Sequence, residues 1–208
     1  MEPLPSTIRT RRLVLRSWVP DDAPALAAAV VASLDHLRPW LPWAADEPIT
    51  IEARRGLLAS FAQDRDVGGD ATYGVFLDGG LDGDAVAGGE AIGGCGLHHR
   101  RGPGTLEIGY WLHVDHTGRG YATELAAALT TAAFAHDGIE TVEIHHDRAN
   151  TASRAVPERL GFNFAGERPD EPAAPAQEGI DCTWTMSRHA WSRLRSVSLP
   201  DDPVHLAD

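Results

Sequence analysis

The sequence predicts one α+β domain, in which a mixed, mostly antiparallel twisted sheet of about six to seven strands carries helices on both faces. Three short β-like runs follow one another without a helical pattern between them. Parallel neighbours need a crossover of about a dozen residues or more, so these runs pair most simply as an antiparallel meander. A later strand–helix–strand pattern is typical of two parallel neighbours. No repeat or composition break marks a second domain, so we expect a single domain at 8–192 between tails 1–7 and 193–208.

The elements can be justified in chain order. Pro20-Asp21-Asp22 opens an Ala-rich helix with acidic residues in its first turn, where the helix dipole favours them. Thr50 is an N-cap for a second helix. Two prolines exclude a regular helix over 37–43. The expected strands are 13–18, 72–77, 91–98, 105–113, 141–146, 162–167 and 182–187, and the expected helices are 21–32, 50–64, 121–137 and 150–160.

Three segments between or after these elements have no regular pattern. The linker Asp78–Glu90 is rich in Gly and Asp. Pro, Glu and Ala dominate Arg168–Gly179, which predicts a flexible loop. The acidic stretch from Ser198 onward predicts a frayed tail.

The charge balance excludes some partners. The formal net charge is −12, and affinity for nucleic acid comes mainly from basic residues that neutralise phosphates, so no nucleic-acid partner is expected. No run approaches the ~18 apolar residues of a membrane span, and the first residues do not form a secretion signal. Two cysteines, Cys95 and Cys182, are too few for a disulfide framework and are expected as buried thiols in a reducing cytoplasm.

The most informative segment is a glycine turn in front of a helix. Gly118 and Gly120 let the backbone come close to a ligand and leave several amide N–H groups pointing outward. A helix N-terminus also attracts anions, so the turn is a candidate site for a pyrophosphate, with Arg119 as a mobile cation beside it. The other interpretation is a turn that serves only to reverse the chain.

A dinucleotide-binding turn is disfavoured. Glu143 lies at a suitable spacing after Gly120, but Thr123 replaces the third glycine of that fingerprint. The preceding elements also lack the repeated strand–helix alternation of doubly wound folds. A nucleotide-binding regulator is therefore the weakest interpretation.

Five segments, in their order and spacing, resemble the GNAT superfamily of N-acetyltransferases and, within it, the RimJ/RimL-like branch. The resemblance covers about residues 8–192 and rests on Thr10-x-Arg12-Leu13-x-Leu15-Arg16, Gly93-x-x-Gly96, Glu107-Ile108-Gly109-Tyr110-Trp111-Leu112, Thr117-Gly118-Arg119-Gly120-Tyr121-Ala122-Thr123-Glu124, and Asn150-x-x-Ser153 with Arg159-Leu160-Gly161-Phe162. It implies the GNAT fold, with the sheet splayed at the cofactor site, acetyl-CoA as the acetyl donor and a primary amine as the acceptor.

The resemblance also implies which residues hold the cofactor. The pyrophosphate lies on Gly118–Ala122 and the pantetheine arm pairs with the strand that carries Trp111, Leu112 and His113. A bulge or bend at Gly109 would direct the following N–H groups at the thioester carbonyl. The full expected set of cofactor contacts is Trp111, Leu112, His113, Thr117, Gly118, Arg119, Gly120, Tyr121, Ala122, Thr123, Asn150 and Ser153.

Catalysis requires a proton acceptor for the amine and a donor for the departing thiolate. Glu107 is the leading candidate for acting as, or orienting, the general base; the other interpretation is a strand carboxylate that pairs with arginine. No tyrosine follows Tyr121, so Ser153 is the available hydroxyl for the thiolate, unless it only caps a helix. Pro157 removes the N–H that would bond the Ser153 carbonyl and leaves the aim of this side chain open.

The acceptor side is less determined. Trp40, Trp43 and Tyr110 are candidates for binding the amine substrate, although the two tryptophans would serve equally as lids on the core. His145 and His146 are adjacent on a strand and point to opposite faces, so no metal site is expected. A peptide N-terminus and a small-molecule amine both stay open as acceptors, and a homodimer is also expected. The competing functions are a non-catalytic acyl-CoA-binding module and an acyltransferase that uses a longer acyl-CoA.

Overall fold

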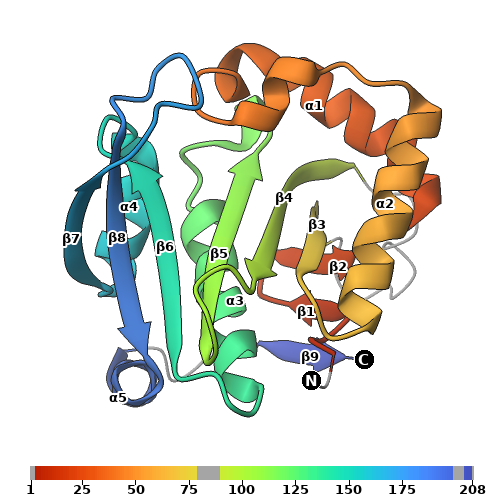
Figure 1. Cartoon of the computed structure of the whole chain (residues 1–208). Helices are drawn as coiled ribbons and strands as arrows, with labels where there is room; N and C mark the ends of the chain where they lie inside the picture. Colours follow the sequence, from red (N-terminus) through yellow and green to blue (C-terminus); the bar gives the residue numbers. More distant parts are fainter. Residues whose placement is uncertain (1–2, 79–89, 199–203, 208) are drawn as a thin grey trace.

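A single mixed sheet organises the molecule (Figure 1). The computed structural model describes residues 3–78, 90–198 and 204–207. Within these residues the sheet has nine strands in the order β7-β8-β6-β5-β4-β3-β2-β1-β9. The strands are β1 (Thr7–Arg9), β2 (Leu13–Ser17), β3 (Ala71–Leu77), β4 (Ala91–His98), β5 (Thr105–Leu112), β6 (Thr141–Asp147), β7 (Asn163–Pro169), β8 (Ile180–Ser187) and β9 (His205–Ala207).

All strand pairs are antiparallel except β5 and β6, which are parallel. The meander β3-β4-β5 and the crossover between β5 and β6 confirm the predicted fold class. The helices are α1 (Ala23–Leu37), α2 (Ile51–Asp66), α3 (Tyr121–Ala135), α4 (Thr151–Leu160) and α5 (Arg188–Ser198), with 3-10 turns at Pro20–Asp22, Pro42–Asp46 and Val114–His116.

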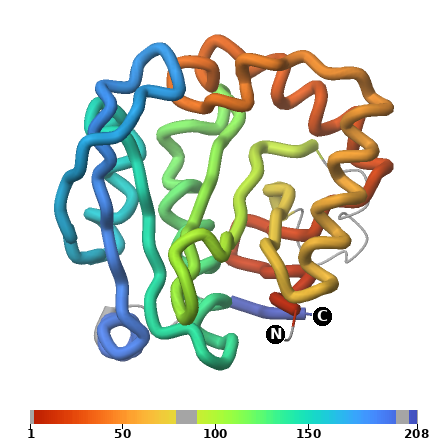
Figure 2. Tube along the Cα trace, in the orientation of Figure 1, coloured from red at the N-terminus to blue at the C-terminus, as the bar shows by residue number. Residues whose placement is uncertain are grey.

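Helices pack on both faces of the sheet (Figures 1 and 2). α3 packs on one face, where Leu125 and Leu129 are fully buried among residues of the central strands. α1 and α2 cover the other face over β2–β4, around Trp18 and Leu58. Two hydrophobic cores, one on each face, therefore hold β4 and β5 between them.

The sheet splays between its two parallel strands. β5 and β6 pair from Thr105↔Thr141 to Ile108↔Ile144 and then diverge, although both strands continue. Their divergence is visible toward the top of Figure 1. At Gly109, where the resemblance predicts a bulge or bend, β5 keeps a regular register with Gly96 of β4. The change at Gly109 is therefore a loss of pairing with β6 and not a bulge against β4.

The end of the chain differs from the sequence prediction. β9 pairs with β1 through Thr7↔Ala207, so a frayed tail is wrong for 205–207. α5 begins at Arg188 and continues past residue 192, and Leu4 is buried in the core. The strands β1 and β9 are three residues long, too short to show a period in the sequence. Residues 79–89 of the predicted linker lie outside the described residues.

The segment after β7 is held in place at several points. The Asp147 carboxylate accepts hydrogen bonds from the backbone N–H groups of Ala149, Glu178, Gly179 and Ile180 at 2.9–3.2 Å. Burial alone would raise the pKa of Asp147, but these four bonds lower it. The loop predicted from composition as flexible is thus fastened to the end of β6.

The same loop reaches across to the connection between α1 and α2. The Gln177 side-chain amide donates to the Trp40 carbonyl at 3.0 Å, and the Ala176 N–H donates to the Pro39 carbonyl at 2.9 Å.

Elsewhere in the fold, Cys95 and Cys182 are both free and buried, as expected for reduced thiols.

Candidate active site

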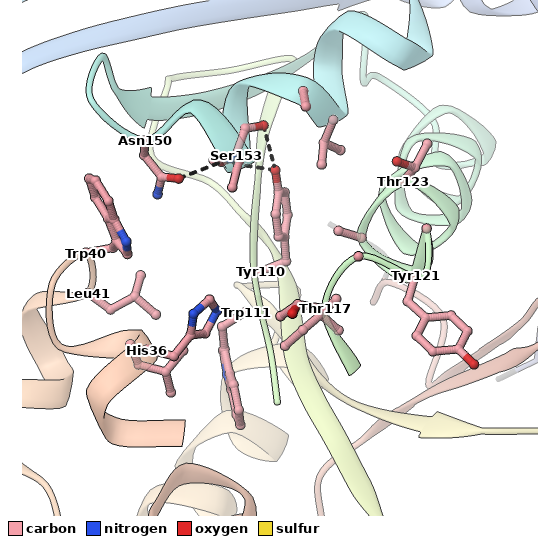
Figure 3. A pocket seen from close by; sticks show the side chains of 18 of the residues that line it. His36, Trp40, Leu41, Tyr110, Trp111, Thr117, Tyr121, Thr123, Asn150 and Ser153 are labelled. Atoms are coloured by element: carbon pink, nitrogen blue, oxygen red, sulfur yellow. Dashed lines mark hydrogen bonds between the residues drawn. The ribbon is translucent and has the colours of Figure 1, made fainter. Parts of the chain in front are cut away.

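A cavity of about 490 Å³ lies where β5 separates from β6 (Figure 3). Four parts of the chain line it: the end of α1 with the segment after it, the end of β5, the glycine turn with the start of α3, and one side of α4 with its N-cap. The lining residues are His36, Leu37, Trp40, Leu41, Tyr110, Trp111, Leu112, Thr117, Gly118, Gly120, Tyr121, Ala122, Thr123, Asn150, Ala152, Ser153, Ala155, Val156 and Arg159.

The glycine turn provides backbone donors at one end of this cavity. Gly118 and Gly120 have left-handed backbones, with φ of 71° and 80°, and Gly120 is the N-cap of α3 without a side-chain cap. The first intrahelical bond of α3 joins the Glu124 N–H to the Gly120 carbonyl at 3.1 Å. The N–H groups of Tyr121, Ala122 and Thr123 therefore have no acceptor inside the helix and suit an anionic ligand.

The turn is held by a contact that the sequence did not predict. Glu124, in the first turn of α3, accepts from the Thr10 hydroxyl at 2.6 Å and from Arg12 Nε at 2.6 Å. The Arg12 guanidinium donates to the Arg119 carbonyl at 3.1 Å and lies 4.6 Å from the Tyr121 ring centroid. The Thr10-x-Arg12 motif thus anchors the glycine turn from the other end of the chain.

Next to the turn in the cavity lining, α4 and β5 bring two hydroxyl groups together. Tyr110 Oη lies 3.1 Å from Ser153 Oγ and 3.3 Å from the Ser153 carbonyl oxygen, to which it can donate. Asn150 Oδ1 accepts from the Ser153 N–H at 3.1 Å, so Asn150 is the N-cap of α4. Figure 3 shows the hydrogen bonds of Ser153 beside the cavity.

Pro157 does not interrupt α4, which runs from Thr151 to Leu160. It has no N–H for the Ser153 carbonyl, and the Tyr110 hydroxyl takes the place of that donor. Burial raises the pKa of Tyr110 to about 12, although the hydrogen bond to Ser153 lowers it. Tyr110 therefore keeps its proton at neutral pH.

Aromatic side chains form the wall opposite α4. Trp40 and Trp111 line the cavity, together with His36 and Leu41. Trp43 is 40% exposed and contacts Trp111 edge to face, with ring centroids 5.9 Å apart. Trp43 supports the wall from outside and is not among the lining residues. Sequence reasoning missed His36 and Leu41, because they lie at and after the end of a helix without a recognisable motif.

Besides Trp43, three expected site residues lie outside the cavity lining. The His113 side chain is buried, and its Nδ1 accepts from the Asp115 N–H at 3.2 Å. The Arg119 side chain is exposed, and the Arg119 carbonyl accepts from Arg12. Glu107 lies on β5 with an odd spacing from Tyr110, so the two side chains point to opposite faces of the sheet.

Glu107 is the centre of an ion-pair network on its own face. Arg101 Nε donates to one carboxylate oxygen at 2.7 Å and Arg100 to the other at 3.3 Å. Arg101 also lies 3.9 Å from Glu143 on the neighbouring strand. Glu107 as a whole residue is 8% exposed. Because both carboxylate oxygens already accept from arginine, an incoming amine would have to compete with these cations for either one.

The network continues along β6 and β8. His145 donates through Nε2 to Glu143 at 2.8 Å and through Nδ1 to Asp181 at 3.0 Å. Burial alone would lower the pKa of His145, but these two carboxylates raise it. The charged form of His145 is therefore the one that this face of the sheet stabilises.

A second histidine lies next to the point where the strands part. Asp70 holds His98 Nδ1 at 2.8 Å, and a Cβ added at Gly109 would lie 3.3 Å from His98 Nε2. His98 thus lies over the glycine at which β5 loses its pairing with β6.

Within the described ranges, no three His, Cys, Asp or Glu residues are grouped so that they could hold a metal ion. Over those same ranges, no helix is both long and apolar enough to cross a membrane.

A cavity beside two diverging strands, lined by free backbone donors and by a pair of hydroxyl groups, is typical of proteins that bind an anionic cofactor. A family model described as "Acetyltransferase (GNAT) domain" matches residues 12–163. The chain is 29% identical over 160 residues to "Putative ribosomal N-acetyltransferase YdaF" of Bacillus subtilis (strain 168), covering 76% of this chain and 81% of that protein.

Two solved structures have the same fold. A RimL ribosomal L7/L12 alpha-N-protein acetyltransferase in complex with coenzyme A has a TM-score of 0.75 and 21% identity, covering 91% of this chain and 99% of that chain. Mycobacterium smegmatis RimJ in complex with CoA-disulfide has a TM-score of 0.75 and 22% identity, covering 94% and 97%. The chain belongs to the GNAT acetyltransferase family and is an acetyl-transferring enzyme. The family model confirms the predicted GNAT resemblance, and RimL and RimJ are among the proteins of similar fold.

Proposed function

We propose that the enzyme transfers an acetyl group from acetyl-CoA to the N-terminal amine of a protein, with both substrates bound at once. The observation that carries the proposal is the continuous cavity from the free amides at Tyr121–Thr123 to the hydroxyl groups of Tyr110 and Ser153. The pyrophosphate would bind the amides, and the unpaired edge of β5 at Trp111 and Leu112 would pair with the pantetheine arm.

The acceptor is proposed from the mouth of the cavity and from the relatives. His36, Trp40 and Leu41 line an aromatic and apolar entrance that suits the first side chain of a peptide. One relative is named as a ribosomal N-acetyltransferase, and a RimL structure is named for ribosomal L7/L12. A ribosomal-protein N-terminus in the cytoplasm is therefore the proposed acceptor, and a homodimer is part of the same prediction.

In the reaction, the amine nitrogen bonds to the thioester carbonyl carbon and loses a proton, and the C–S bond breaks with its electron pair on sulfur. Backbone N–H groups of β5 beyond Gly109 would stabilise the oxyanion. Ser153 would donate a hydrogen bond to the thiolate. Glu107 is proposed to assist proton removal. Because Arg100 and Arg101 already occupy its carboxylate, we propose that Glu107 orients the groups around the amine and does not take the proton itself.

The test is thiol release from acetyl-CoA in the presence of peptides with free N-termini, compared with the same peptides acetylated at the N-terminus and with small amines such as spermidine. We expect release with free N-terminal peptides alone. Release only with small amines would overturn the proposed acceptor. A preference for propionyl-CoA over acetyl-CoA would support a longer acyl donor, and binding of acetyl-CoA without release under any condition would contradict the proposed chemistry.

A further inference from the structure

The Tyr110 hydroxyl, beside the cavity, has two possible hydrogen-bond acceptors. Pro157 leaves the Ser153 carbonyl without its helical donor, and Tyr110 Oη lies 3.3 Å from that carbonyl oxygen and 3.1 Å from Ser153 Oγ. A tyrosine hydroxyl has a single proton and can also accept. The direction of the bond between the two hydroxyl groups then decides what the Ser153 proton can do.

Two arrangements are compatible with these distances. If Tyr110 donates to the Ser153 carbonyl, Tyr110 Oη can accept a hydrogen bond from the Ser153 hydroxyl. The Ser153 proton is then not available to a ligand. If Tyr110 donates to Ser153 Oγ, the Ser153 proton is free to point into the cavity. A negative charge in the cavity favours the second arrangement, because the two hydrogen bonds then point in the same direction and strengthen each other.

We propose that Tyr110 is a positioning residue for acetyl transfer: its hydroxyl donates to Ser153 Oγ when the thiolate forms and so directs the Ser153 proton to the coenzyme A sulfur. This inference rests on the proposed function, since it requires the thioester at the Ser153 end of the cavity. It moves Tyr110 from the acceptor side, where the sequence placed it, to the leaving-group side.

The proton balance is closed. As the C–S bond breaks, the Ser153 hydroxyl keeps its proton and donates a hydrogen bond to the thiolate. Solvent takes the proton that the amine nitrogen loses and returns one to sulfur, so coenzyme A leaves as the thiol. Tyr110 keeps its own proton throughout, because burial raises its pKa to about 12. The role of Tyr110 is therefore to orient the donor and not to act as the acid.

The experiment compares coenzyme A with desulfo-coenzyme A, which lacks the sulfur, by calorimetric titration at about pH 9, above the usual thiol pKa of about 8.5. The measured quantity is the Kd of desulfo-coenzyme A divided by the Kd of coenzyme A. We expect this ratio to fall about tenfold in Tyr110→Phe, the size of effect that a hydrogen bond to a charged group produces. Tyr73→Phe is the matched control, because it removes a tyrosine–carbonyl bond of 2.8 Å to Pro5, which is not among the lining residues.

A double variant tests whether Tyr110 only supplies the hydrogen bond that the Ser153 carbonyl lacks because of Pro157. In Tyr110→Phe/Pro157→Ala the backbone N–H at position 157 can bond the Ser153 carbonyl again. We expect this second change to recover thermal stability but not the Kd ratio. Recovery of the ratio, or an unchanged ratio in Tyr110→Phe, would overturn the inference, as would a wild-type ratio of one. Failure of wild type to bind either ligand would contradict the proposed function instead.

Discussion

Asn150 and Ser153 lie three residues apart, yet their side chains have different tasks. Asn150 Oδ1 caps α4, whereas the Ser153 side chain bonds the hydroxyl of Tyr110 at the cavity. From the sequence alone, Ser153 could equally have been the residue that caps the helix. The geometry assigns the cap to Asn150.

This division predicts opposite effects of two substitutions. Asn150→Ala should lower the free energy of unfolding by about 1 kcal/mol, because an N-terminal amide of α4 loses its acceptor. Ser153→Ala should leave stability nearly unchanged and slow the chemical step about 100-fold, the low end for a positioned donor. Denaturant unfolding and single-turnover rates on both variants check the prediction. A stable, fully active Ser153→Ala protein would remove this residue from the site.

Glu107 pairs with arginine, as one of its two sequence interpretations expected. Glu107→Gln keeps the shape but loses the charge that Arg100 and Arg101 bind. We expect kcat to fall by about tenfold or more with little change in acetyl-CoA affinity, and the loss to be largest below the pKa of the acceptor amine. Steady-state rates across pH, with acetyl-CoA affinity measured separately, check both parts.

The control for this variant is Glu143→Gln, a neighbouring carboxylate that lies 3.9 Å from Arg101. It tests whether disturbing the ion-pair network is by itself enough to reduce kcat. Full activity of Glu107→Gln at every pH would transfer proton removal to solvent or to a histidine such as His98, which lies over Gly109.

At the scale of elements, the turn before α3 is the part that binds the cofactor in our proposal. Gly120→Val should raise the Kd of coenzyme A about tenfold or more, because a side chain would block the approach of the pyrophosphate to the amides. The substitution also strains the left-handed backbone at φ of 80°. Isothermal titration with coenzyme A measures the effect.

Gly138 provides a matched control for that strain. It has φ of 83°, open space where a Cβ would be added, and a place beyond the end of α3, away from the cavity lining. Gly138→Val should therefore cost a similar amount of stability and leave the Kd unchanged. Equal affinities in both variants would refute the assignment of the turn to the pyrophosphate.

At the scale of the whole molecule, the charged face of the sheet links β5, β6 and β8. Burial alone would raise the pKa of Asp181, but His145 lowers it from 3.8. Burial alone would lower the pKa of His145, but its two carboxylates raise it from 6.5. The Asp181 contribution to stability is present above pH 3.8 and lost as pH falls through its lower folded pKa. The His145 contribution is present below pH 6.5 and lost as pH rises through its higher folded pKa.

His145→Gln should therefore lower Tm most between about pH 4 and 6.5, with a smaller difference from wild type above neutral pH. Melting curves across this range test the sign. His189→Gln, at an exposed position on α5, is the control and should leave the pH profile unchanged. A His145→Gln deficit that grows with increasing pH would contradict the charged hydrogen-bonded state of His145.

Local patterns made most of the fold predictable. The glycine turn, the Thr50 cap and the meander are each encoded within a few consecutive residues, and all are present. Contacts between distant residues were not predictable in this way. Arg12 meets Glu124 across 112 positions and Tyr110 meets Ser153 across 43, while β1 and β9 are too short to have a pattern of their own. Only the packed sheet brings these pairs together.

Hydrogen bonds from Gln177 and Ala176 join the segment after β7 to the segment at Pro39 and Trp40. In our proposal the acetyl donor is recognised elsewhere, by the glycine turn and α4. The entrance is built instead by two connecting loops that hold each other, one of them fastened to the end of β6 through Asp147. Sequence drift in those loops can therefore change which amine enters while the donor half of the reaction stays intact, so the acceptor repertoire of such an enzyme can evolve separately from its chemistry.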